Sequence, residues 1–209
     1  MNRNTMLRND DYAKTLRRLG KLKEKINAPE FISSKRKANE VNSWVFDYPP
    51  EQELAVREYI GELAAKNNKY NDSFQIYTYD LYDIIIDFLE SEEFIGQCDK
   101  YEQGYGIGQV ASSIKTVTRV NMEENLFTEH IRAHTPPERA VVFLTGVGKC
   151  YPMLQANEVF NKIQYNMPAA YNKVPMIVFY PGTYTEQELI LFNKIHEANY
   201  YRAFRIVRD

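Results

Sequence analysis

Cysteine and histidine are scarce in this chain of 209 residues. It has two cysteines, Cys98 and Cys150, and three histidines, with no CxxC pair. A fold stapled by disulfides needs more cysteines, and a zinc module needs several ligands at close spacing. The composition therefore excludes a disulfide scaffold and argues against a zinc module. Both thiols are expected to be reduced.

Long hydrophobic runs are also missing. The longest uncharged apolar stretches, 140–148 and 174–182, span about ten residues, whereas a helix that crosses a bilayer needs about 20. The first residues include basic side chains but no apolar core or small-residue cleavage site, unlike a secretory signal. We expect a cytoplasmic protein with no membrane contact.

The net charge of −2 conceals a division along the chain. Residues 1–40 carry eleven Lys and Arg against five Asp and Glu, and residues 41–209 carry 15 against 23. Apolar side chains in the basic segment recur at steps of three and four, which predicts a basic helix capped by Asp10 or Asp11. The apolar stripe consists of Tyr12, Leu16, Leu19, Leu22 and Ile26.

Three interpretations of this basic helix stay open. It can dock on the body with its basic face in solvent, serve as an arm for an acidic partner protein, or contact a phosphate backbone. The partner-binding candidates on it are Lys14, Arg17 and Arg18. We predict two parts: an arm over 1–40 and an α/β domain over 41–209.

From residue 42 onward, short runs rich in β-branched and aromatic residues alternate with helical patterns. Several runs are almost continuously apolar, as in parallel strands buried on both faces. Strand–helix alternation predicts a three-layer α/β/α fold with about five mostly parallel strands, in an order near 2-1-3-4-5. The predicted strands are Ser43–Asp47, Phe74–Tyr79, Ala140–Thr145, Pro175–Tyr180 and Tyr201–Val207.

Helix signals follow the first four runs. Pro49 and Pro50 can open a helix that extends to about residue 66, and Asp80 can cap the next. Pro152 can begin another, and Thr185 with Glu188 forms a capping box for a helix after the fourth strand. The interval of about 91–139 is too long for a loop, so we predict a helical insertion with helices over 109–119 and 122–134.

The residues that leave each strand are the first place to look for function, because open parallel sheets bind ligands at the carboxyl ends of their strands. These are Asp47, Asp80, Thr145 with Gly146, and Pro181 with Gly182. Two carboxylates at such ends could hold Mg²⁺, but aspartate is equally favoured there as a helix cap or turn residue.

The loop after the third strand, LTGVGKC, has part of a phosphate-binding pattern. A Walker A loop needs GxxxxGK[ST], yet Phe143 stands at its first glycine and Cys150 at its Ser/Thr position. We therefore predict a tight strand-to-helix turn, with a degenerate anion or ligand site as the alternative. That site would comprise Asp47, Asp80, Thr145, Gly146, Gly148 and Lys149.

The remaining motifs favour structural roles. The glycines of 104–108 do not follow a strand as a Rossmann fingerprint requires, so they predict a flexible loop. His130 and His134 are spaced as a zinc pair, but no third ligand is visible. Cys150 beside Lys149 has a plausible environment for a lowered pKa, but no histidine is placed as its base. We expect no enzyme, no metal and no cofactor.

Four segments resemble the BrxB family: NSWVFDYPPEQELAVREYI (42–60), VVFLTGVGKCYPMLQANEVFNKIQ (141–164), VPMIVFYPGTY (174–184) and NYYRAFRIVRD (199–209). The resemblance covers roughly residues 10–209. It implies a cytoplasmic component of a BREX (bacteriophage exclusion) system, which modifies host DNA and blocks phage replication. It implies no established catalytic residues. The family's closest associate is PglZ, an alkaline-phosphatase-superfamily protein of the same operons.

The last strand suggests where a partner could dock. Its alternation places arginines on both faces, and a buried strand tolerates guanidinium groups only if they meet carboxylates. Either acids of this chain pair with them or a partner does. We predict a non-enzymatic assembly subunit that docks PglZ or another BREX subunit, with Tyr201, Arg202 and Arg205 as further docking residues.

The alternative function is a regulatory protein that binds a nucleotide or nucleic acid at the Thr145–Lys149 turn. Direct DNA binding through residues 1–40 is a variant of this alternative. In that case the affinity for DNA should fall steeply with salt, because bound counterions are released from the phosphates. We expect any contact with DNA to be indirect.

Overall fold

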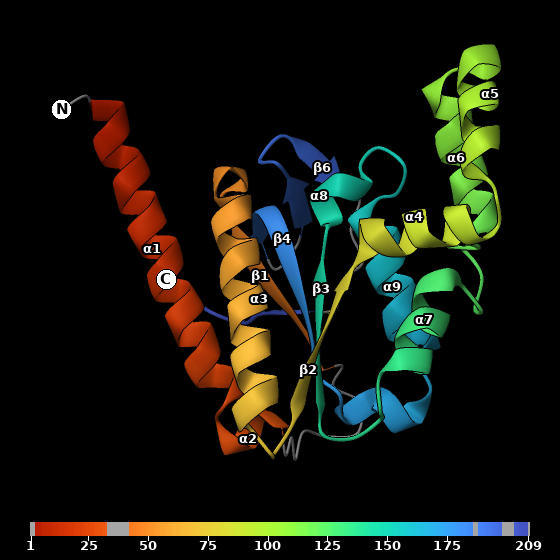
Figure 1. Cartoon of the computed structure of the whole chain (residues 1–209). Helices are drawn as coiled ribbons and strands as arrows, with labels where there is room; N and C mark the ends of the chain where they lie inside the picture. The colour runs from red at the N-terminus through yellow and green to blue at the C-terminus, as the bar shows by residue number, and fades with distance from the viewer. Residues whose placement is uncertain (1–2, 33–41, 186–187, 198–202, 209) are drawn as a thin grey trace.

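A parallel sheet lies between two layers of helices in the computed structural model, which describes residues 3–32, 42–185, 188–197 and 203–208 (Figure 1). This arrangement confirms the predicted three-layer α/β fold. Every pair of neighbouring strands in the main sheet is parallel. The strands are β1 (Ser43–Tyr48), β2 (Gln75–Asp80), β3 (Ala140–Thr145), β4 (Met176–Thr185) and β7 (Phe204–Arg205).

The strand order differs from the prediction. The sheet runs β2-β3-β4-β1-β7, so the first strand pairs with the fourth and the last instead of lying beside the second. All six residues of β1 are buried, and the strand is in register with β4 from Ser43 opposite Met176 to Tyr48 opposite Pro181. A strand buried on both faces belongs inside the sheet. The partly exposed β2 lies at its edge.

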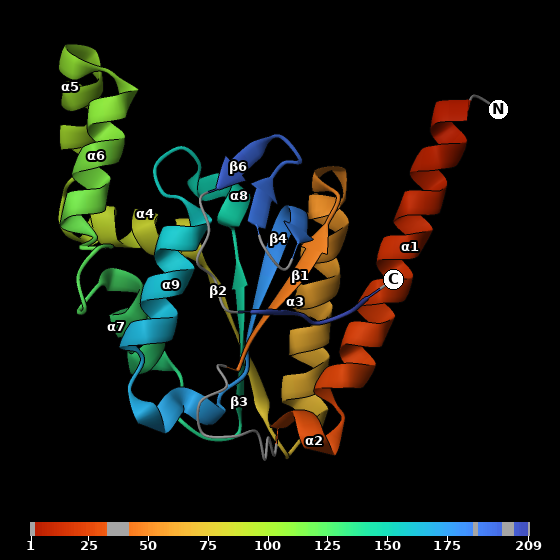
Figure 2. The ribbon, with the colours of Figure 1, turned by 180° about the vertical axis from the view of Figure 1, so that it is seen from behind.

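Helices α1 (Arg3–Ile26), α2 (Pro29–Ile32) and α3 (Glu53–Tyr70) cover one face of the sheet (Figures 1 and 2). A short 3-10 helix, η1 (Pro50–Gln52), leads into α3. Because α1 begins at Arg3, the predicted cap at Asp10 or Asp11 is wrong. The predicted apolar stripe is buried only in its second half: Leu19 is 0% exposed, whereas Tyr12 is 43% and Leu16 38% exposed.

The other face is covered by α4 (Leu81–Ser91), α7 (Leu126–His134), α8 (Val147–Cys150) and α9 (Ala156–Asn166), and the 3-10 helix η2 (Ala169–Lys173) precedes β4. The predicted cap is confirmed, since Asp80 Oδ1 accepts hydrogen bonds from the N–H groups of Tyr82 at 3.1 Å and Asp83 at 3.3 Å. The predicted helix opening at Pro152 lies four residues before the start of α9.

The insertion between β2 and β3 is helical as predicted. Its helices α5 (Ile95–Tyr105) and α6 (Ile107–Val117) form a lobe that projects from the body at the opposite edge from α1 (Figures 1 and 2). The predicted flexible loop over 104–108 is wrong. Its residues extend both helices, and Gly106, with φ +79°, forms the corner between them. A positive φ is a conformation that glycine adopts without strain.

The predicted helix after the fourth strand is also wrong. β4 continues into a hairpin of β5 (Glu188–Leu191) and β6 (Ile195–Glu197), and Thr185 pairs with Glu188 across antiparallel strands instead of capping a helix. The reason lies at Gly182: a Cβ there would be 2.1 Å from the backbone oxygen of Ile190. Glycine thus lets the two strands approach.

Within the described ranges, no helix is long and apolar enough to cross a membrane.

Candidate functional site

A polar cleft lies between α1 and the carboxyl ends of β1 and β4, where parallel sheets usually bind ligands. Its volume is about 250 Å³. We call it the Asp47 cleft. It brings together four of the residues predicted from the sequence, which are Lys14, Arg18, Asp47 and Arg205.

Asp47 forms the centre of this cleft and is only 6% exposed. Its Oδ1 accepts a hydrogen bond from Arg18 Nη2 at 2.7 Å, and its Oδ2 accepts one from Arg205 Nη2 at 2.7 Å. The backbone N–H of Tyr184 also donates to Oδ2, at 3.1 Å. One carboxylate therefore binds two guanidinium groups and a strand amide, so it is not free to hold a metal or take a proton from a substrate.

The two arginines connect Asp47 to distant parts of the chain. Arg18 of α1 donates to the backbone oxygens of Asp47, at 2.6 Å, and Val207, at 3.3 Å. Arg205 of β7 donates to the backbone oxygen of Tyr184 at the end of β4. Because these contacts join α1, β1, β4 and the C-terminal segment, the cluster fixes α1 to the sheet.

Lys25, in the last turn of α1, adds a second attachment. Its Nζ donates to the backbone oxygen of Ile206 at 2.8 Å and lies 4.5 Å from the ring centre of Trp44. Figure 1 shows the segment of residues 203–208 reaching α1, in agreement with the contacts of Ile206 and Val207. The terminal segment thus holds the second half of the helix against the sheet.

The other predicted docking residues differ in position. Arg17 is exposed on α1, and Lys14 is exposed at the rim of the Asp47 cleft. Arg18 is 8% exposed, and Arg205 meets an acid of its own chain, which is the intramolecular alternative left open by the sequence. Tyr201 and Arg202 lie outside the described residues.

The Thr145–Lys149 turn is a tight strand-to-helix turn, as predicted. Gly146 adopts φ +75°, and a Cβ on it would be 2.0 Å from Asp80 Oδ1, so glycine is required for both backbone and space. Thr145 Oγ1 donates to the backbone oxygen of Tyr79 at 3.4 Å. Gly148 lets α8 pack on the hairpin, because a Cβ there would be 2.8 Å from the ring of Phe192.

Lys149, the cation of this turn, is already neutralised by acids. Its Nζ lies 2.7 Å from Asp80 Oδ2 and 2.8 Å from Asp83 Oδ1. Burial lowers the pKa of Lys149, but hydrogen bonds to the two carboxylates outweigh this effect and raise it. Two negative charges around one positive charge disfavour a phosphate at this place.

The two strand-end aspartates do not meet. β3 and β4 lie between β2, which ends at Asp80, and β1, which carries Asp47. At a strand spacing of about 4.8 Å, three spacings put the two strands about 14 Å apart. They cannot share a magnesium ion. In the part of the chain that the structure describes, no group of three or more His, Cys, Asp or Glu side chains could hold a metal ion.

The thiol and the histidine pair have unreactive surroundings. Burial, with a smaller effect of Asp80, raises the pKa of Cys150 to about 12, so the neighbouring Lys149 does not make this thiol reactive and the favoured structural role stands as the prediction. His134 Nδ1 lies 2.8 Å from the backbone oxygen of His130, and the two rings are 4.4 Å apart. Burial and the neighbouring His134 both lower the pKa of His130.

Sequence reasoning missed a buried acid, Glu197, at the end of β6. It is 4% exposed and accepts hydrogen bonds from the N–H groups of Ala156 at 3.1 Å and Asn157 at 3.3 Å, at the start of α9. Burial raises the pKa of Glu197, although the two backbone donors act against this shift. No local signal could have shown that a hairpin carboxylate caps a helix 40 residues earlier.

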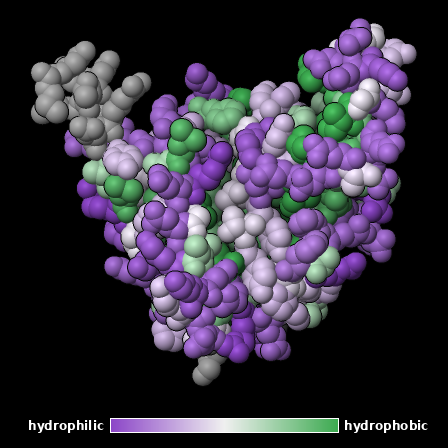
Figure 3. Space-filling model, in the orientation of Figure 1, coloured by the Kyte–Doolittle hydropathy of each residue, from purple (hydrophilic) through white to green (hydrophobic). Residues whose placement is uncertain are grey.

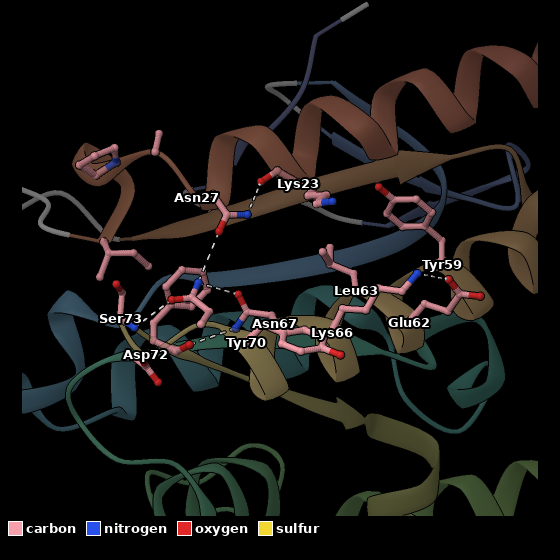
Figure 4. Close-up of a pocket in the computed structure, with 15 residues that line it drawn as sticks. Lys23, Asn27, Tyr59, Glu62, Leu63, Lys66, Asn67, Tyr70, Asp72 and Ser73 are labelled. Carbon is pink, nitrogen blue, oxygen red and sulfur yellow. Dashed lines mark hydrogen bonds and ion pairs between the residues drawn. The ribbon is translucent and has the colours of Figure 1, made fainter.

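A larger pocket of about 970 Å³ lies at the opposite end of the sheet, between the last turns of α1 and α3 (Figure 4). Its asparagine amides bond one another and the backbone. Asn71 Nδ2 donates to Asn67 Oδ1 at 2.8 Å and Asn27 Oδ1 at 3.4 Å, and Asn67 Nδ2 donates to the oxygen of Phe74 at 3.0 Å. This network joins α1, α3 and the start of β2, which is a structural role.

Comparisons with known proteins agree with the resemblance in the sequence. A family model described as "BREX protein BrxB" matches residues 77–206. A BREX protein BrxB of Bacillus cereus (strain H3081.97) is 33% identical over 190 residues, which cover 91% of this chain and 96% of the relative. A BREX protein BrxB of Escherichia coli O9:H4 (strain HS) is 28% identical over 193 residues, which cover 92% of this chain and 91% of the relative. No solved structure matches significantly. The chain belongs to the BrxB family.

Proposed function

We propose that this BREX protein is a non-enzymatic assembly subunit that docks PglZ, or another BREX subunit, in the cytoplasm through the basic side of α1. The observation that carries this proposal is the surface beside the Asp47 cleft. Lys14, Arg17 and Lys21 are all exposed, and their spacing of three and four residues puts them on one side of the helix. We call these three residues the basic flank of α1.

The charges of the cleft favour an acidic partner. Of the charged side chains that line it, Lys14, Arg18 and Arg205 are positive and Asp11 and Asp47 are negative, so the described lining carries one more positive than negative charge beside Arg17 and Lys21 of the basic flank. The side chain of Arg205 is 31% exposed, and the arginine fork suits carboxylate oxygens. Acidic side chains of a partner would complement this surface, and their attraction would weaken with salt.

The state of the polar groups supports an assembly role over catalysis. Asp47 is occupied by three donors, Lys149 by two carboxylates, and the raised pKa of Cys150 keeps the thiol protonated at neutral pH. Asp47 and Lys149 are therefore committed to ion pairs within the chain, and Cys150 is a buried, protonated thiol.

The test is co-purification of the tagged full-length protein from cells that express the BREX operon with and without PglZ. We expect PglZ to be retained by the wild-type protein, and Arg17→Glu to reduce the retained amount at least fivefold. Lys69→Glu is the matched control, because it reverses an exposed charge at the far end of α3. A protein that purifies alone from the complete operon would contradict the proposal.

The nucleotide alternative would need a cation at the Thr145–Lys149 turn. Since Lys149 is already paired with Asp80 and Asp83, no specific observation favours it. Calorimetry with ATP, GTP and Mg²⁺ should give no binding heat, and a clear isotherm would reopen this alternative.

A further inference from the structure

The helical lobe carries an apolar groove that takes no part in the Asp47 cleft. We call it the lobe groove. Its volume is about 250 Å³, below the roughly 300 to 1,000 Å³ of common small-molecule pockets, so it suits one or two large side chains. Its lining comes from α4, α5 and α6 and includes Leu89, Phe94, Tyr101, Val110, Ile114 and Val117.

Large apolar side chains are exposed on α5 and α6. Tyr101, which lines the groove, is 44% exposed. Tyr105, whose ring lies 5.7 Å from that of Tyr101, is 75% exposed, and Ile107, three residues before the lining residue Val110, is 53% exposed. Figure 3 shows hydrophobic surface gathered over the lobe at the upper right. A cluster of exposed apolar side chains on one projecting element is typical of an interaction site.

The chain around the lobe groove is acidic. From the first to the last residue that lines the groove, 89–117, it contains five Asp and Glu against two Lys. One of these two cations is engaged, since Lys115 pairs with Glu158 at 2.9 Å. An occupant of the lobe groove should therefore combine large apolar anchors with positive charge.

The first half of α1 has this combination. Tyr12 and Leu16 are exposed, and their spacing of four residues puts them on one side of the helix. The stretch of α1 around them, residues 3–18, carries five Lys and Arg against two Asp. An amphipathic helix commonly binds a hydrophobic groove through apolar side chains that are spaced one turn apart. The first half of α1 lies at the edge of the molecule away from the lobe, so the groove that it can enter belongs to another copy (Figures 1 and 2).

We propose that copies of this protein associate head to tail, with Tyr12 and Leu16 of α1 of one copy seated in the lobe groove of the next. The two surfaces differ, so the interface is heterologous and can extend from copy to copy or close into a ring. On α1, Tyr12 and Leu16 lie on one side of the buried stripe, and Lys14, Arg17 and Lys21 lie on the other side. The head-to-tail contact and the proposed PglZ contact therefore use different surfaces of the helix.

Sedimentation velocity of the full-length protein over a range of concentrations tests this proposal. We expect an average mass above that of one chain at low salt, and association at least tenfold weaker in about 0.5 M salt, where charges are strongly screened. A single-chain mass at every concentration in low salt would overturn the proposal.

Two exposed-site variants then test the direction of contact. Leu16→Glu removes an anchor but keeps the groove, and Tyr101→Glu damages the groove but keeps the anchors. Each should be monomeric alone, whereas their mixture should form a 1:1 dimer, because one intact anchor meets one intact groove. Tyr70→Glu, at an exposed aromatic residue of α3, is the control and should associate as the wild type does.

Circular dichroism melting curves should show that all three variants stay folded. Association that survives both Leu16→Glu and Tyr101→Glu, or a mixture that stays monomeric although the wild type associates, would overturn the head-to-tail contact. These readouts need no PglZ, so they are independent of the proposed function.

Discussion

Replacement of Asp47 tests the attachment of α1 to the sheet. The carboxylate binds Arg18, Arg205 and the N–H of Tyr184, and the side chain of Arg18 is only 10% exposed. Asp47→Asn keeps the shape of the side chain but removes its charge. The Arg18 guanidinium would then stay buried but lose its ion pair with the Asp47 carboxylate.

The structure sets the expected size of the effect. Removing one partner of a buried ion pair costs about 3–5 kcal/mol, because the other charge stays desolvated. Arg205 adds less, since its side chain is 31% exposed and can turn to water. We expect Asp47→Asn to lower the free energy of unfolding by about 3 kcal/mol, and Asp47→Ala by up to about 5 kcal/mol. In a protein of this size, 3 kcal/mol corresponds to about 6–12 °C in Tm.

Urea denaturation followed by circular dichroism measures this loss. The matched control is Glu129→Gln, which removes the same charge from an exposed ion pair with Arg119 and should cost less than about 1 kcal/mol. If Asp47→Asn costs no more than Glu129→Gln, the cluster does not hold α1 and the reasoning is refuted. Arg205→Ala should also lower Tm, so Arg17, which is exposed, is the cleaner position for docking tests.

Three further predictions concern other parts of the molecule. Gly146→Ala should cost about 1–3 kcal/mol or more in urea denaturation, because of its positive φ and the collision with Asp80, whereas Gly61→Ala in the open middle of α3 should raise stability slightly. Burial raises the pKa of Glu197, so the folded state binds this proton more tightly than the unfolded state. The wild type should therefore lose stability relative to Glu197→Gln as the pH rises from about 4.5 through the raised pKa, and parallel urea curves over pH would contradict this. Cys150, with a pKa of about 12, should react with a disulfide reagent at neutral pH only after denaturation, and rapid reaction of the folded protein would show that the thiol is accessible.

Local chemistry made several features predictable. Four of the strands come from apolar runs with clear boundaries, and Asp80 caps α4 because aspartate is favoured where a strand leads into a helix. The incomplete Walker A pattern also allowed a correct prediction, that of a tight turn instead of a phosphate-binding loop. Phe143 and Cys150 stand where the motif needs glycine and Ser/Thr, and the structure shows a compact turn there.

The errors arise where distant residues decide. Leu189 and Leu191 fit a helix or a strand, and the close contact of Gly182 with Ile190 selects the strand. Strand order also depends on packing between segments far apart in the sequence, which periodicity does not encode. The Asp47 cluster joins residues 29 and 158 positions away, so the sequence could suggest each charged member but not their pairing.

Direct titration of purified full-length protein with purified PglZ of the same BREX system tests the central claim most directly. The account predicts saturable binding heat, with an affinity that falls as salt increases and is at least tenfold lower for Arg17→Glu, while Lys69→Glu binds as the wild type does. Absence of binding to PglZ and to every other BREX subunit, or equal affinity of Arg17→Glu and the wild type, would contradict docking through the basic flank of α1.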